Sequence, residues 1–143
     1  MPANSWKVAP GLNAVGAYQV SGRPYATGSI DCSDDDRSLE DCTVVFPYVA
    51  RWFQVINKDA SNDCKVAFSI SGMTGSFNYF TVPKADVDAN GAAGVSGILE
   101  LKVSSIVISG STNVDVVAGL TSIPAYQTKT DSGMNWSGSS GVG

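Results

Sequence analysis

The sequence predicts an all-β fold, a sandwich or jelly roll of seven or eight strands. The clearest indication lies in residues 98–120, where apolar and polar residues alternate, stop at a turn cluster at 110–113, and resume. The chain also contains 15 glycines, and turn-forming residues separate its apolar runs at short intervals, as in proteins with many short strands. No segment shows a convincing helical period or an internal repeat.

The N-terminal part is expected to form an arm and then the first strand. Residues 1–16 are irregular and hold few apolar side chains. Residues 17–22 are predicted to be a strand, and residues 23–28 are its extension or its return. Pro24 marks an edge or a break in this strand, because proline cannot donate to a sheet ladder.

The middle of the chain is predicted to hold a central strand. Two runs, 43–46 and 48–57, flank Pro47, and the second run is long, aromatic and β-branched. Trp52 and Phe53 are neighbours in this run, so their side chains point to opposite faces. At least one of these two rings is therefore expected in the core.

Further strands and loops are expected in the C-terminal half. They are strands at 64–71, 77–82, 98–109 and 114–120, a loop of small residues at 84–97, and an exit at 121–124. In strand 98–109 the apolar residues change face at Ser104–Ser105, which indicates a bulge or burial on both faces. The length of 143 residues suits one domain, which we place at 17–125 between an N-terminal arm (1–16) and a C-terminal tail (126–143).

The charge pattern argues against nucleic acid as a partner. Charged residues make up only 15% of the chain, below the roughly 25% of an average domain, so much of the surface is either polar and uncharged or covered by partners. Residues 31–41 hold six acidic residues and one basic residue, and they set the sign of the net charge of −4. This segment is expected to be a solvated loop; its functional alternative is a face that repels polyanions or meets a basic partner. No basic stripe could neutralise phosphates.

The termini and the thiols indicate a chain without a membrane span or a common zinc site. No secretory leader is recognisable at Met1, and no apolar run approaches the roughly 18 residues that a membrane helix needs. Cys32, Cys42 and Cys64 cannot all pair within one chain, and there is no CxxC and no histidine to complete a zinc site. Reduced thiols are expected, and a Cys32–Cys42 bridge is the alternative.

An enzymatic role is not expected. The chain has no histidine, the commonest acid–base catalyst. Carboxylate pairs such as Asp86 with Asp88, or Asp115 with Glu100, could be nominated for hydrolysis, but nothing in their spacing favours either pair.

One segment matches the beginning of a calcium loop. Asp86, Asp88 and Asn90 alternate as cation ligands do and precede a glycine. The twelfth position is Gly97 in place of the bidentate glutamate, so a plain polar turn is the favoured interpretation. No metal and no other cofactor is expected.

Large aromatic residues in the two arms suggest contacts between subunits. An indole in an arm leaves apolar surface wet unless it docks on its own subunit or on a neighbour, and such rings are typical interface anchors. The residues expected at contacts are Trp6, Leu12, Tyr18, Tyr126 and Trp136.

Five segments resemble a known family of viral proteins. They are Trp6-Lys-Val-Ala-Pro-Gly-Leu-Asn-Ala-Val-Gly-Ala-Tyr-Gln-Val-Ser-Gly-Arg-Pro-Tyr, Phe46-Pro-Tyr-Val-Ala-Arg-Trp-Phe-Gln-Val-Ile-Asn, Leu101-Lys-Val-Ser-Ser-Ile-Val-Ile-Ser, Val116-Val-Ala-Gly-Leu-Thr-Ser-Ile-Pro and Asn135-Trp-Ser-Gly-Ser. They are similar to the small single jelly-roll capsid proteins of viruses, and most of all to the penton proteins of large icosahedral DNA viruses such as those infecting algae.

The resemblance implies an eight-stranded single jelly roll with extended N- and C-terminal arms. Five copies would form the capsomer at each fivefold vertex of the virion, after synthesis in the host cytoplasm, with the N-terminal arm beneath neighbouring capsid proteins. It brings no catalytic residues. The chain is short for a penton, so a minor capsid or decoration protein of a virus or phage is an alternative. A carbohydrate-binding or receptor-binding sandwich module is a second one.

Overall fold

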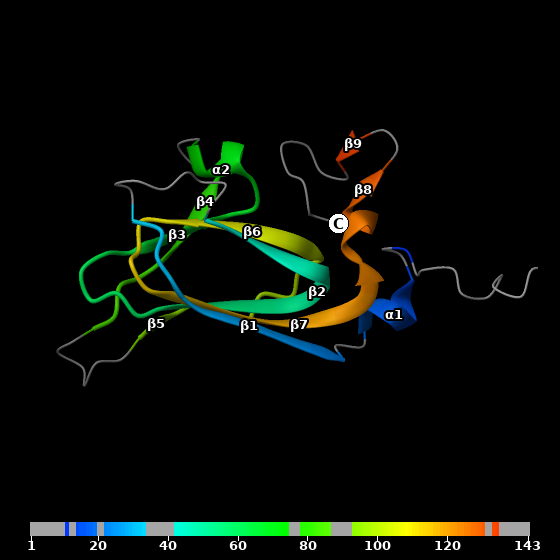
Figure 1. The fold of residues 1–143 in the computed structure, drawn as a ribbon, viewed down its shortest axis with the longest axis horizontal. Coiled ribbons are helices and arrows are strands. Elements are labelled where there is room, and N and C mark those ends of the chain that lie inside the picture. The colour runs from blue at the N-terminus through cyan, green and yellow to red at the C-terminus, as the bar shows by residue number, and fades with distance from the viewer. Residues whose placement is uncertain are drawn as a thin grey trace, which may run out of the picture.

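The chain folds almost entirely into antiparallel strands (Figure 1). The computed structural model describes residues 11, 14–19, 22–33, 42–74, 78–86, 93–130 and 133–134. Its elements are, in order, α1 (Val15–Gln19), β1 (Arg23–Ile30), β2 (Thr43–Asn57), β3 (Cys64–Ala67), α2 (Ile70–Thr74), β4 (Tyr79–Val82), β5 (Gly94–Val95), β6 (Val103–Ser109), β7 (Val114–Pro124), the 3-10 helix η1 (Ala125–Thr128), β8 (Lys129–Thr130) and β9 (Gly133–Met134).

Seven of the described strands are joined in one antiparallel network. The order is β1-β7-β2-β6-β3-β4, and β5 pairs with β2 outside this path. Strands β8 and β9 form a separate two-stranded ribbon. The predicted all-β class is therefore confirmed, and β2 lies near the centre of the order, as its aromatic and β-branched composition predicted.

Strand β2 belongs to two layers because it bends near Pro47. Its first residues, 43–45, pair with β6, whereas the part from Tyr48 to Asn57 pairs with β7 and, at its end, with β5. Register shifts accompany the bend on both sides of Ala50. Figure 1 shows the strand turning at one end of the molecule and running back in the second layer. Pro47 is exposed at the bend. Proline has no backbone N–H to donate, but at this position the sheet loses no hydrogen bond as a result.

The hydrophobic core lies between these layers. Phe53 is fully buried in it, while the neighbouring Trp52 is half-buried, as expected for adjacent residues of one strand. Strand β6 is buried on both faces: Ile106 and Ile108 belong to the main core, and Val107 packs in a smaller cluster with Met73 of α2. Burial on both faces explains the change of apolar face at Ser104–Ser105.

The expectation of no helix was wrong, and several strand boundaries were wrong with it. Helix α1 occupies part of the expected strand 17–22, and α2 begins inside the expected strand 64–71. Both helices have five residues, too few to show a helical period in the sequence. Within the described ranges, no helix has the length and apolar character that crossing a bilayer requires.

The strand expected at 98–109 is also shorter than predicted, because the chain changes layers within it. Leu99 exchanges backbone hydrogen bonds of 3.0 and 2.9 Å with Phe53 in one layer. From Val103 onward the chain runs as β6 in the other layer. Apolar and polar residues continue to alternate where the chain passes from one layer to the other. The sequence pattern alone therefore could not show where β6 begins.

Candidate functional site

The candidate site lies at the end of the molecule where β2 bends. Helix α1 packs against β7 there, and η1 packs against β2 and β6. Both helices are seen on the same side of Figure 1, next to the C-terminal end of β7 and the beginning of β1. Segments from both ends of the described chain therefore meet at this end of the sandwich.

Tyr18 fastens α1 to the sandwich. Its hydroxyl donates to the carbonyl oxygen of Arg51 at 3.3 Å, and the Arg51 guanidinium donates to the carbonyl oxygen of Gln19. The Lys102 ammonium lies 5.1 Å from the centre of the Tyr18 ring. Burial, together with the negative charge of Glu100, raises the pKa of the Tyr18 hydroxyl. Tyr18 is thus half-buried among contacts of its own subunit.

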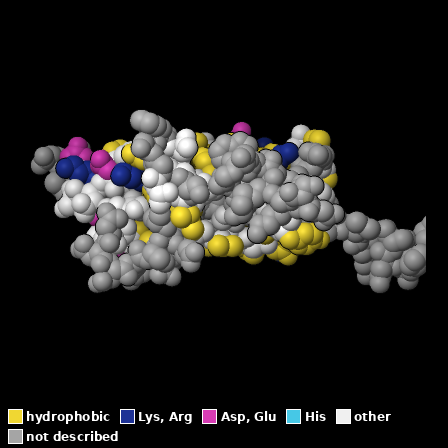
Figure 2. Space-filling view, turned by 90° about the horizontal axis from the view of Figure 1, so that it is seen from above, with side chains coloured by type: hydrophobic (Ala, Val, Ile, Leu, Met, Phe, Trp, Pro, Cys, Tyr) yellow, Lys and Arg dark blue, Asp and Glu magenta, His cyan; other side chains and the backbone are white. Residues whose placement is uncertain are grey.

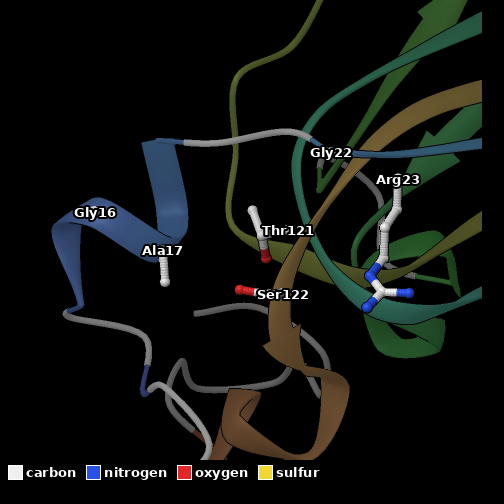
Figure 3. Close-up of a pocket in the computed structure, with 6 residues that line it drawn as sticks. All are labelled: Gly16, Ala17, Gly22, Arg23, Thr121 and Ser122. Atoms are coloured by element: carbon white, nitrogen blue, oxygen red, sulfur yellow. The ribbon is translucent and has the colours of Figure 1, made fainter.

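A cleft of about 500 Å³ separates α1 from the strands beside it (Figure 3). Its lining residues are Gly16, Ala17, Gly22, Arg23, Thr121 and Ser122. Figure 3 shows α1 on one side and β7 on the other, with the Ala17, Thr121 and Ser122 side chains between them. The walls therefore come from three separate segments, and all their residues except Arg23 are small.

The polar groups of the cleft are largely committed to the fold. The buried Thr121 hydroxyl donates to the carbonyl oxygen of Val49 at 2.7 Å and accepts from the Ile123 N–H at 3.2 Å. The Arg23 guanidinium lies over the Tyr48 ring, 4.3 Å from its centre, in a cation–π contact. These contacts leave a recess with few groups that could carry out chemistry.

The recess has room for an inserted side chain. A Cβ atom placed on Gly16 or on Gly22 would meet no atom within 4 Å. Both glycines therefore border open space. The recess, with a volume of about 500 Å³, is large enough to accept a side chain from another molecule.

Exposed apolar side chains accompany the recess. Val15 of α1 is 65% exposed and Tyr126 of η1 is 66% exposed. Ile98 and Leu101, in the segment that leads into β6, are exposed as well. Figure 2 shows hydrophobic side chains gathered along the lower border of that view, toward the end that holds α1. The predicted contact residue Tyr126 is thus accessible, unlike Tyr18.

Other residues singled out from the sequence are not brought into a common site. Trp6, Leu12, Trp136, Asp88 and Asn90 lie outside the described residues. Asp86 is exposed after β4. Among the described side chains, no group of three or more His, Cys, Asp or Glu residues could hold a metal ion.

The nominated carboxylates have separate surroundings. Asp115 forms an ion pair with Lys58 at 3.1 Å and accepts from the Ser29 N–H at 2.9 Å. Glu100 is exposed, and its charge acts on Tyr18. These contacts give Asp115 a role in holding β1 and the end of β2 beside β7.

The opposite end of the sandwich carries a buried polar network that the sequence analysis missed. The Asp59 carboxylate accepts from the N–H groups of Ser61, Asn62 and Thr112 at 2.7, 3.2 and 3.0 Å and from the Thr112 hydroxyl at 2.8 Å. The N–H of Thr112, followed by that of Ser61, holds the pKa of Asp59 well below its usual range although the residue is buried. An acidic residue followed by Ser and Asn after a strand is the signal that indicates such a turn.

Asn57 connects this network to the sheet. Its side-chain oxygen accepts from the Asp59 N–H at 3.1 Å and from the Ser111 hydroxyl at 2.8 Å. Its amide group donates to the carbonyl oxygens of Asn62 and Pro83 at 2.9 and 3.3 Å. The network ties three loops together and is fully occupied in doing so, which indicates a structural role.

The three cysteines are free thiols, and all are buried in the main core. Burial raises the pKa of Cys32 and raises that of Cys64 to about 11. Neither group is therefore a thiolate at neutral pH, and the usual basis of a nucleophilic cysteine is missing at both.

Known proteins give no direct indication of function. No family model, curated protein sequence or solved structure matches this chain. The functional argument therefore depends on the strand topology and on the end of the molecule that carries α1.

Proposed function

We propose that this chain is a structural protein of a viral capsid, a single jelly roll that packs side by side with copies of itself. The strand pairing is the observation that carries this proposal. The recess and the exposed apolar residues at the α1 end supply the lateral contact surface, and the segments listed above supply the resemblance to penton proteins.

The pairing is nested from the two ends of the chain inward. If β2 is divided at Pro47, β1 pairs with β7, the first half of β2 pairs with β6, and the second half pairs with β5. The innermost pair is β3 with β4, while β2 with β7 and β3 with β6 join these pairs into layers. This nested pairing supports the proposed jelly roll, in which a long ribbon of strands is rolled into two layers.

A fold alone does not define a function, so the surface has to supply the rest. A closed ring uses heterologous contacts, in which one surface of a subunit meets a different surface of the next. The recess between α1 and β7 is concave and lined mostly by small residues, whereas Val15 and Tyr126 protrude as apolar side chains. Complementary surfaces of this kind suit subunits that repeat around an axis.

In this proposal five copies form the capsomer at an icosahedral vertex, beside major and minor capsid proteins. The low proportion of charged residues, 15%, suits large shared surfaces, because unpaired charges are costly to bury.

The decisive experiment measures the mass of the assembled full chain. Native mass spectrometry and particle imaging should show symmetric rings of about five times the 14.8 kDa of one chain. A protein that stays monomeric at high concentration, and that does not join viral shells when it is produced with them, would contradict the proposal.

A pair of glycine variants tests the recess itself. Gly16→Leu should place a bulky side chain at the border of the recess and abolish the rings without unfolding the subunit, because Gly16 lines the recess and a Cβ at this position meets nothing within 4 Å. Gly97→Leu is the matched control, since Gly97 also borders open space but lies away from the recess lining. If the Gly16→Leu variant assembles like the unmodified chain, the recess is not the lateral contact.

A small-molecule binding module is a second candidate, and the volume of the recess favours it. About 500 Å³ lies within the range of small-ligand sites, although those are usually lined by larger apolar and aromatic residues. A titration with a panel of glycans, followed by tryptophan fluorescence, distinguishes the two candidates. A saturable response from a monomeric protein would replace the capsid proposal with this one.

A further inference from the structure

The three cysteines gather around the end of β6. The Cys32 N–H donates to the carbonyl oxygen of Ser111 at 2.7 Å, and the Cys32 carbonyl accepts from the Gly110 N–H at 2.8 Å. The Cys42 carbonyl accepts from the Ile108 N–H at 3.1 Å. Two cysteines ten positions apart in the sequence are therefore bound to the same short stretch of backbone.

The sulfur atom of Cys42 lies against the peptide bond that leads into Cys32. Its Sγ is 4.0 Å from the carbonyl oxygen of Asp31, the residue directly before Cys32. Both side chains are buried, with exposed fractions of 2% and 4%. Two cysteines held this close by their backbones need little movement to form a disulfide.

Cys64 belongs to the same core cluster but lies in a paired strand. It lies in β3 and is fully buried, and its thiol lies 3.7 Å from the carbonyl oxygen of Lys65. Lys65 pairs with Ser109 of β6, so the sheet fixes the backbone at Cys64.

We infer that Cys32 and Cys42 are an oxidation site that forms one intramolecular disulfide, while Cys64 remains a thiol. The oxidant is a small disulfide such as oxidised glutathione. Local opening exposes one of the two buried thiols to water, where it ionises and attacks the oxidant. It forms a mixed disulfide and releases one glutathione thiol; the second cysteine then displaces the other. Two thiol hydrogens leave the protein, the S–S bond forms, and one molecule of oxidant is reduced to two thiols.

The bond would stabilise the fold and does not depend on the proposed assembly. It closes the chain between Cys32 and Cys42 and so restricts the unfolded state. For a ring of this size in a chain of 143 residues, the melting temperature should rise by about 5–10 °C. Reduction should return it to the starting value.

Peptide mapping of the full chain identifies the bonded pair directly. The folded protein is incubated with oxidised glutathione, unfolded in the presence of iodoacetamide so that buried thiols are alkylated, and digested with trypsin. The three cysteines then fall in different peptides, residues 8–37, 38–51 and 59–65. The expected product is a monomer lighter by two hydrogens, with peptide 8–37 joined to peptide 38–51 and with peptide 59–65 alkylated.

Each other result would overturn the inference. These results are a bond to peptide 59–65, a bond between two chains, or three alkylated cysteines after oxidation of the folded protein. The Cys64→Ala variant should form the same bond, and Cys42→Ala should lose it and leave Cys32 to be alkylated. The map of the unmodified chain decides the question even if the Cys42→Ala variant does not fold.

Discussion

The two ends of the sandwich are built on different principles. At one end, the loops after β2 and β6 are joined by the buried side chains of Asn57 and Asp59, whose polar atoms have partners. At the other end, α1 and η1 border a recess, and Val15 and Tyr126 leave apolar surface exposed. At the first end the side chains of Asn57 and Asp59 are paired within the chain, although the buried Asn113 Oδ1 beside them has no partner among the described residues. The other end offers surface to a second molecule.

This difference separates stability from interaction. Buried hydrogen bonds to amide and carboxylate groups stabilise a fold mainly because their loss leaves polar groups without partners. Exposed apolar side chains contribute little to the stability of the subunit, yet they are the groups that association covers. Substitutions at the two ends should therefore have opposite effects on unfolding and on assembly.

Replacement of Asn57 should have the largest effect on stability. Asn57 is fully buried. Asn57→Ala removes the side-chain oxygen, which accepts two hydrogen bonds, and the amide group, which donates to the carbonyl oxygens of Asn62 and Pro83. The free energy of unfolding should fall by about 3–4 kcal/mol. Urea denaturation measures this loss, and Asn78→Ala at an exposed position should change it by less than about 0.5 kcal/mol. Equal effects of the two substitutions would remove the distinction between the ends.

Asp59→Asn should have a smaller effect that depends on pH. At neutral pH the variant should lose about 2 kcal/mol, because an amide cannot accept all the hydrogen bonds that the carboxylate accepts. The pKa of Asp59 is lowered in the folded state, so its contribution is complete above the unfolded pKa of about 3.9. As the pH falls below this value toward the folded pKa, the contribution is lost.

Urea denaturation at several pH values tests this sign. The difference between the unmodified chain and the Asp59→Asn variant should be constant from pH 7 to 5 and should shrink at pH 3. Glu100→Gln, at an exposed carboxylate outside the network, is the control. A difference that grows on acidification would show that the network does not stabilise the ionised form.

The Lys58–Asp115 ion pair should contribute less. Its atoms are 3.1 Å apart, but about a third of each side chain is exposed, with values of 37% and 29%. Lys58→Met should therefore cost only about 0.5 kcal/mol, and added salt should reduce the difference. Thermal unfolding in low and high sodium chloride measures it, with Lys84→Met at an exposed position as the control. A loss that is large and independent of salt would point to packing of the lysine stem instead.

Substitutions at the α1 end should have the smallest effect on unfolding. Val15→Ser and Tyr126→Ser alter exposed side chains, so the free energy of unfolding should change by less than about 0.5 kcal/mol. Ring formation should nevertheless weaken, and sedimentation measures it. Val95→Ser provides the comparison, because this exposed valine of β5 lies outside the α1 end. Rings that persist in the first two variants would mean that subunits meet through another surface.

The sequence predicted the parts of the fold in which a local pattern decides the structure. Strands β6 and β7 were recognisable because alternating apolar residues flank a turn whose Gly110 has a φ of +92°, a conformation that suits glycine. The pattern did not show that the two strands pair with other strands and not with each other. The bend of β2 was not recognisable from the sequence. Pro47 predicts a break between two strands, and only the tertiary pairing shows that one continuous strand belongs to two layers. Helix α1 depends on the contact of Tyr18 with Arg51, thirty-three positions away.

The candidate site was less accessible to prediction than the fold. Tyr126 was selected for its ring, and it is exposed. The recess is formed mostly by small residues from three segments, and nothing in the local sequence marks Gly16 or Ser122 as neighbours. The proximity of Cys32 and Cys42 could be considered from their spacing, whereas the position of Cys64 beside them follows only from the pairing of β3 with β6.

The sharing of β2 between layers has a consequence for how the protein unfolds. Because one backbone of 15 residues supplies a strand to each layer, neither layer can open as an independent unit. Amide protons in Val44 and in Val55 should then exchange with solvent through the same global event. Most of the pairings also join distant parts of the chain, which predicts slow folding with a single cooperative barrier.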